Sequence, residues 1–95
     1  MQHNIQQEEK ESKGSFFIEN NGSRLAEMTY SKAGDTMIII DHTEVDDALR
    51  GTGAGQALVE AAVLWARENK KKIMPLCPFA SSVFRKNPSY QDVIK

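Results

Sequence analysis

Alternating apolar and polar positions in the first half of the chain predict three β-strands joined by tight turns. Residues 15–20 read Ser-Phe-Phe-Ile-Glu-Asn, and residues 20–23 are rich in side chains that tolerate a positive φ, which predicts a turn. Residues 24–30 alternate with a period of two, as in a half-buried strand. Residues 36–42 contain three consecutive isoleucines, which suit a central strand covered on both faces. Together these runs predict an antiparallel meander.

The second half of the chain changes to a helical period. Apolar residues recur three and four positions apart, at Leu58, Ala61, Ala62, Trp65 and Ala66. This pattern predicts one amphipathic helix that ends near Asn69. Residues 72–76 predict a fourth strand and residues 79–84 a short helix. The strand–helix–strand order predicts a right-handed crossover, which places the fourth strand parallel to the third.

The expected fold class is therefore α+β (α/β). It consists of an antiparallel three-strand meander, a glycine loop, a central helix, a fourth strand parallel to the third, and a short C-terminal helix. Residues 1–13 hold few apolar side chains and are expected to form a frayed tail, followed by a single domain at residues 14–95.

Charge and composition narrow the expected partners. The 12 basic and 13 acidic side chains give a net charge of −1, so we expect a small-molecule partner rather than nucleic acid or a membrane. No run of about 18 apolar residues and no signal-peptide core is present, which predicts a soluble, cytoplasmic protein. The single cysteine, Cys77, cannot form an internal disulfide, and no metal-ligand spacing is found, so no metal is expected.

The segment Arg50-Gly51-Thr52-Gly53-Ala54-Gly55 opens the predicted helix and is the strongest functional signal. Its glycines let a ligand approach the backbone, and the helix N-terminus supplies free N–H groups and the positive end of the dipole. Arg50 adds a cation and Thr52 a hydroxyl group. The loop lacks the Gly-Lys-Ser/Thr ending of a P-loop and the third glycine of a dinucleotide fingerprint. It therefore predicts a phosphate-rich ligand other than ATP, NAD or FAD, with a simple connecting turn as the alternative.

These residues resemble the GNAT superfamily of acyl-CoA N-acyltransferases. Arg50-x-x-Gly53-x-Gly55 is similar to the superfamily motif Gln/Arg-x-x-Gly-x-Gly/Ala. Residues 42–45, Pro75-x-Cys77 and residues 84–90 resemble the small single-domain YjdJ-type members, so the resemblance covers about residues 15–95. It implies an acetyl-CoA cosubstrate held by Val45, Arg50, Gly51, Thr52, Gly53, Ala54, Gly55, Asn87 and Tyr90. The helices that usually follow the first strand of the superfamily, and its late strands, have no counterpart here.

Acetyl transfer from a thioester to an amine needs a deprotonated amine and a stabilised leaving thiolate. The resemblance places Cys77 near the thioester, where it would act either as a nucleophile or as a proton donor to departing CoA. A buried packing cysteine is the alternative. His42 and Glu44, at the end of the third strand, are candidates for a proton relay from the amine, and a histidine satisfied by backbone groups is the alternative for His42.

Three further features are candidates for ligand contacts. The resemblance implies that Asn87 and Tyr90 reach the pantetheine arm or the sulfur, whereas a helix stop and a core aromatic are the alternatives. Residues 70–72 are three lysines that could meet the 3′-phosphate of CoA, although such a triplet is typical of a solvated helix end.

The expected function is an acetyl-CoA-dependent N-acetyltransferase (EC 2.3.1 class) that acts on a small amine or a protein lysine. A CoA or acyl-CoA binding module with little or no transferase activity is the main alternative. A phosphate-binding interaction domain that takes no CoA is a third possibility.

Overall fold

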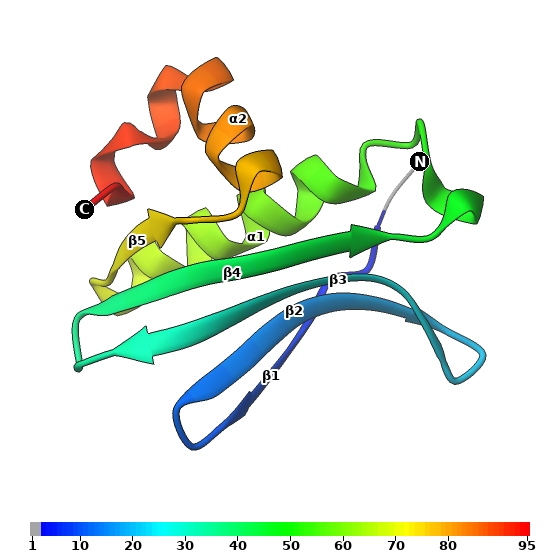
Figure 1. Ribbon diagram of the computed structural model, residues 1–95, viewed down its shortest axis with the longest axis horizontal. Helices are drawn as coiled ribbons and strands as arrows, with labels where there is room; N and C mark the ends of the chain where they lie inside the picture. The colour runs from blue at the N-terminus through cyan, green and yellow to red at the C-terminus, as the bar shows by residue number, and fades with distance from the viewer. Residues whose placement is uncertain (1–2) are drawn as a thin grey trace.

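The computed structural model describes residues 3–95, which form one five-stranded sheet with both α-helices on the same face (Figure 1). The elements are β1 (Gln6–Lys10), β2 (Lys13–Asn20), β3 (Ser23–Ala33), β4 (Met37–Val45), the 3-10 helix η1 (Asp47–Leu49), α1 (Ala54–Asn69), β5 (Lys72–Pro75), α2 (Pro78–Lys86) and the 3-10 helix η2 (Pro88–Val93). The strand order in the sheet is the order along the chain.

The predicted meander and crossover are confirmed. Strands β2, β3 and β4 pair antiparallel, and β5 pairs parallel with β4 after the crossover through α1. The turn between β2 and β3 is as tight as expected, with both Asn21 and Gly22 at positive φ. None of the helices in the described part of the chain is long and apolar enough to cross a membrane.

One face of the sheet and one face of α1 form the core. Leu58, Val59, Ala62 and Val63 of α1 are fully buried, and β-branched and other apolar side chains of the sheet are buried with them. The expectation that the isoleucine run is covered on both faces is wrong. Ile38 and Ile40 are buried, but Ile39 is only half-buried, because it points to the face that carries no helix.

The N-terminal segment also differs from the expected frayed tail. Residues 6–10 form β1, which pairs antiparallel with β2, and residue 13 already belongs to β2. Tyr30 is fully buried, and its hydroxyl accepts from the Gln7 side chain at 2.9 Å and donates to Glu9 at 2.7 Å. A buried tyrosine needs polar partners for its hydroxyl. These polar β1 side chains supply them, so the strand forms without an apolar pattern of its own. Residues 1–2 of the expected tail lie outside the described residues.

Replacing Glu9 with glutamine is expected to destabilise the fold at neutral pH by about 0.5 kcal/mol, the scale of a largely exposed ion pair. The pKa of Glu9 is lowered, chiefly by the ammonium group of Lys32 at 2.8 Å and further by the Tyr30 hydroxyl. A lowered pKa adds stability above the pKa of the unfolded chain, and this stability is lost as the pH falls through the folded-state pKa. Urea unfolding of the parent protein and the variant at pH 7 and pH 3 measures this difference in the free energy of unfolding. An equal Glu9→Gln effect at both pH values would contradict it.

Candidate functional site

The glycine loop ends at the N-terminus of α1 in the geometry of an anion site. Gly53 is the N-cap residue and has φ +83°, and Gly51 has φ +79°. The Ala57 N–H donates to the Gly53 carbonyl at 2.9 Å. The preceding N–H groups of the first turn therefore have no acceptor within the helix. They point out of the helix end, where the dipole also favours an anion.

Gly55 serves a different purpose from the two glycines before it. Its φ is not positive, but a Cβ at this position would lie 2.5 Å from the ring of Phe79. Phe79 belongs to the first turn of α2 and is 42% exposed. The missing side chain at Gly55 thus lets the aromatic ring of α2 rest directly on the first turn of α1.

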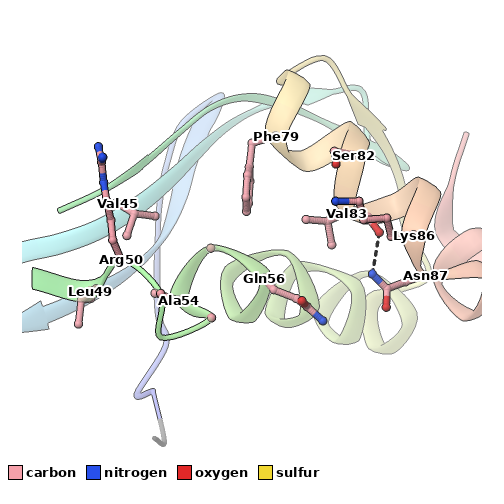
Figure 2. Close-up of a pocket in the computed structure, with 13 residues that line it drawn as sticks. Val45, Leu49, Arg50, Ala54, Gln56, Phe79, Ser82, Val83, Lys86 and Asn87 are labelled. Atoms are coloured by element: carbon pink, nitrogen blue, oxygen red, sulfur yellow. Dashed lines mark hydrogen bonds between the residues drawn. The ribbon is translucent and has the colours of Figure 1, made fainter. Parts of the chain in front are cut away.

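A cavity of about 590 Å³ opens between the loop and α2 (Figure 2). It is lined by Val45, Leu49, Arg50, Gly51, Gly53, Ala54, Gly55, Gln56, Phe79, Ser82, Val83, Lys86 and Asn87. This size is typical of small-molecule sites. The lining contains two cations and no carboxylate, although acidic side chains outnumber basic ones in the whole chain. The cavity is therefore electrostatically suited to an anion.

The cavity reaches the end of β4 at Val45, where the sheet opens. Pairing between β4 and β5 ends at Ile40 and Pro75, whereas β4 runs on to Val45. The N–H groups of Leu76 and Cys77 both donate to the Ile40 carbonyl, and the chain then turns into α2. Beyond Ile40, no strand within residues 3–95 pairs with the edge of β4 that faced β5, so its backbone can bind an extended ligand.

A β-bulge in β4 decides which side chains face this opening. Tyr30 pairs with Ile40 and Thr29 with His42, so Asp41 is an extra residue in β4. Strict alternation from Ile38 and Ile40 would turn His42 and Glu44 toward the helices. The bulge reverses the alternation, so that Thr43 and Val45 take the helical face instead.

Cys77 is the N-cap residue of α2 and follows β5 in the chain; it lies outside the cavity lining. Cys77 is 5% exposed, and its thiol donates to the Thr43 hydroxyl at 3.4 Å. Burial by itself raises the pKa of the Cys77 thiol. Hydrogen bonds to the sulfur lower the pKa by more than burial raises it, so the pKa of Cys77 lies below its ordinary value. These bonds come from the Thr43 hydroxyl and from the backbone N–H groups of Ala80 and Phe79. The site therefore favours a thiolate more than an ordinary buried position does.

His42 and Glu44 lie together on the other face of β4. Their side chains are 3.0 Å apart, from Nε2 to Oε1, and both are exposed. They line a second cavity of about 490 Å³, together with Thr43, Val45, Arg50, Asp46 and residues 24–27. Val45 and Arg50 line both cavities, so the two meet at the end of β4. Among residues 3–95, no three histidine, cysteine or acidic side chains are grouped so as to hold a metal ion.

Comparison with known proteins identifies the family of this chain. A family model described as GCN5-related N-acetyl-transferase matches residues 15–93. Protein NATD1 of Gallus gallus is 31% identical over 85 residues, which span 88% of this chain and 77% of NATD1. The chain belongs to the GCN5-related N-acetyltransferase (GNAT) family.

Solved structures agree with this assignment. A GCN5-like protein from Staphylococcus aureus, determined by NMR, is 42% identical with a TM-score of 0.73, and the match covers 97% of this chain and 89% of that one. AAC(6′)-Iy in complex with the bisubstrate analogue CoA-S-monomethyl-acetylneamine is 12% identical with a TM-score of 0.54, over 85% of this chain and 62% of that one. The second likeness shows a shared fold alone.

GNAT enzymes use acetyl-CoA, and the cavity has the features that such a donor requires. The free N–H groups at the start of α1 and the guanidinium of Arg50 can hold a pyrophosphate. Arg50 is exposed and currently pairs with Asp47 at 3.0 Å. This surface pair is weak enough to be exchanged for a phosphate. Val45, Gly51, Gly53, Ala54 and Gly55 line the same cavity.

Three other residues expected at the donor site have partners within the protein. Thr52 Oγ1 donates to the Leu49 carbonyl at 2.6 Å and lies 3.1 Å from His3 Nε2. Asn87 lines the cavity, but its amide donates to the Val83 carbonyl at 2.7 Å, at the end of α2 (Figure 2). Tyr90 is buried outside the cavity lining, and its hydroxyl donates to Glu60 at 3.2 Å. Their roles toward a GNAT donor therefore stay predictions.

Thr43, Phe79 and Lys86 were not among the site residues expected from the sequence. Thr43 reaches Cys77 only because of the bulge, which carries no glycine or proline to signal it. Phe79 could have been recognised as the aromatic partner of a small residue at Gly55, but the two lie on separate helices of the GNAT fold. Lys86 comes last in a short helix whose orientation the sequence pattern does not define.

Proposed function

We propose that this chain is an acetyl-CoA-dependent N-acetyltransferase that acts on a primary amine, a small molecule or a protein lysine, through Cys77. One observation carries the proposal. The cation-lined cavity at the N-terminus of α1 reaches Val45 at the end of β4, two residues from Thr43, whose hydroxyl contacts the Cys77 thiol. A cavity suited to phosphate and the Cys77 thiol thus both adjoin the last residues of β4.

Acetyl-CoA would supply the activated acetyl group as a thioester. Its pyrophosphate would lie at Arg50 and the first turn of α1, where the N–H groups need no rearrangement to bind it. The pantetheine arm would follow the open edge of β4, whose backbone groups beyond Ile40 have no strand partner. This placement brings the thioester toward Thr43 and Cys77.

Cys77 is proposed as the nucleophile, because its hydrogen bonds favour the thiolate. Its sulfur attacks the thioester carbonyl carbon, a bond forms between Cys77 Sγ and the acetyl carbon, and the bond from that carbon to the CoA sulfur breaks. The departing thiolate takes a proton from solvent. An amine then attacks the acetyl-Cys77 carbonyl, the new C–N bond forms, and the Cys77 thiolate is released.

The second cavity is proposed as the acceptor side. It meets the first cavity, here called the donor cavity, at Val45 and Arg50. Thr43 lines the second cavity and also contacts Cys77. His42, which lies 3.0 Å from Glu44 on the opposite face of β4 from Cys77, would take the proton that the amine loses through water in the cavity that it shares with Thr43. The cavity is exposed and lacks a cover, which suits the amine of a flexible side chain as well as a small molecule.

Replacing His42 with glutamine is expected to lower kcat/KM by about 100-fold, the usual contribution of a general base. The pH dependence of kcat/KM in the parent protein should be lost in the variant, because the proton acceptor has been removed. CoA affinity should be unchanged, since His42 does not line the donor cavity. A flat pH profile for the parent protein would rule out a histidine base.

Mass spectrometry of the protein incubated with acetyl-CoA tests the whole proposal. With no acceptor present, one acetyl group is expected on Cys77, and adding an amine should remove it and yield the acetylated amine. Amine acetylation without acetyl-Cys77 would replace the covalent route with direct transfer. CoA binding with neither product, across small amines and lysine peptides, would favour the CoA-binding module instead.

A further inference from the structure

The two cations of the donor cavity lie at opposite ends of its lining. Figure 2 shows Arg50 beside the glycine loop and Lys86 beside Asn87 at the far end of α2, with Phe79 between them. Arg50 lies next to the free N–H groups of α1, which already complete one anion site. Lys86 belongs to α2 rather than to the glycine loop and constitutes a second positive centre of the lining.

Lys86 also has no acidic partner in the described structure. Within residues 3–95 no carboxylate oxygen lies within 4.0 Å of its ammonium group, whereas Arg24, Lys32, Arg50 and Arg67 each pair with an acid. Its side chain is exposed at the rim of a cavity whose lining contains no acidic residue. An unpaired cation in this position is available to a ligand that occupies the cavity.

The lysine triplet at residues 70–72 is at the wrong place for the same ligand. It follows the C-terminus of α1, and the 16 residues of that helix separate it from the loop by about 24 Å at 1.5 Å per residue. Two of the three ammonium groups also donate to backbone carbonyls, Lys71 to Asp35 and Lys72 to Asp92. None of the three lines the donor cavity.

We infer that Lys86 forms a second phosphate subsite, which takes the 3′-phosphate of the CoA ribose while the glycine loop takes the pyrophosphate. This inference rests on the proposed donor site. A phosphate monoester carries about −1.5 to −2 charges near pH 7, so it is the most strongly charged part of CoA. Two separate cations in one cavity match the two separate phosphate groups of a single ligand. Lys86 thereby discriminates CoA from analogues that lack the 3′-phosphate.

Calorimetric titration with CoA and with dephospho-CoA tests this inference on the full chain. The parent protein is expected to bind CoA about tenfold more tightly, as for one charge-assisted contact. Lys86→Gln should weaken CoA binding about tenfold and leave dephospho-CoA within about twofold, so that the preference disappears. Lys86→Arg should retain it.

Arg85→Gln is the matched control. Arg85 precedes Lys86 on α2, is exposed and lies outside the cavity lining, so the substitution removes the same net charge without touching the site. It should keep the preference for CoA. Equal affinity of the parent protein for CoA and dephospho-CoA, or an equal effect of the two variants, would overturn the inference while leaving the donor site in place. Failure to bind either ligand would overturn both.

Discussion

Cys77→Ala is expected to lower the rate of acetyl transfer by about 100-fold or more, the scale lost with an essential acid–base or nucleophilic group. The thiol is the only side chain of its kind in the chain, and Thr43 and the start of α2 favour its thiolate. Transfer is measured as CoA released from acetyl-CoA in the presence of an amine. Cys77→Ser should lose nearly as much, because a hydroxyl group is a weak nucleophile at neutral pH.

The Cys77 variants should still bind CoA, and this separates chemistry from folding. Cys77 does not line the donor cavity, so CoA affinity is expected to stay within about twofold of the parent value. Thr43→Val is a useful companion, since it removes the hydroxyl partner and keeps the thiol. It should slow transfer less than Cys77→Ala. Parent-like turnover in Cys77→Ala would eliminate a catalytic role for this residue.

Gly53→Ala is expected to weaken CoA binding by at least about tenfold while changing stability by only about 1 kcal/mol, the cost of a left-handed alanine. Gly53 has φ +83°, and a Cβ there would meet no protein atom within 4 Å. The added methyl group would therefore enter open space at the N-cap of α1, in the lining of the cavity that is proposed to hold the phosphate. Calorimetric titration with CoA and thermal unfolding of the same variant measure the two effects.

Gly34→Ala is the matched control for this loop. Gly34 has φ +74° and also has no atom within 4 Å of an added Cβ, but it lies in the turn between β3 and β4, outside the donor cavity. It should show a similar loss of stability and an unchanged affinity for CoA. Equal affinities for Gly53→Ala and the parent protein would show that the phosphate does not approach this glycine.

Much of the fold was predictable because local patterns and packing agree. The period-two strand at residues 24–30 and the helical period from Leu58 to Ala66 each bury the face that the pattern indicates. Strand β1 was not predictable in this way. Its five residues are all exposed, and it is held by pairing with β2 and by the buried hydroxyl of Tyr30, a partner far away in sequence.

In the candidate site, too, some features follow from the local sequence and others depend on contacts between distant segments. The helix N-terminus behind Gly53 is a local feature, and it lies at the cavity as the glycine pattern predicts. The faces of β4 depend on a bulge at Asp41, which pairs Thr43 with Cys77 and leaves His42 and Glu44 on the opposite side. Such a shift in register arises from the fit between two strands and leaves no signature in either one.

An amide NMR titration of the parent protein with CoA tests the central claim most directly. The account predicts saturable binding, with the largest chemical-shift changes at the amides of residues 51–56, and further changes along the end of β4 and at Lys86. Cys77→Ala should give the same pattern. An absence of binding, or shift changes confined to the opposite edge of the sheet at β1 and β2, would contradict the account.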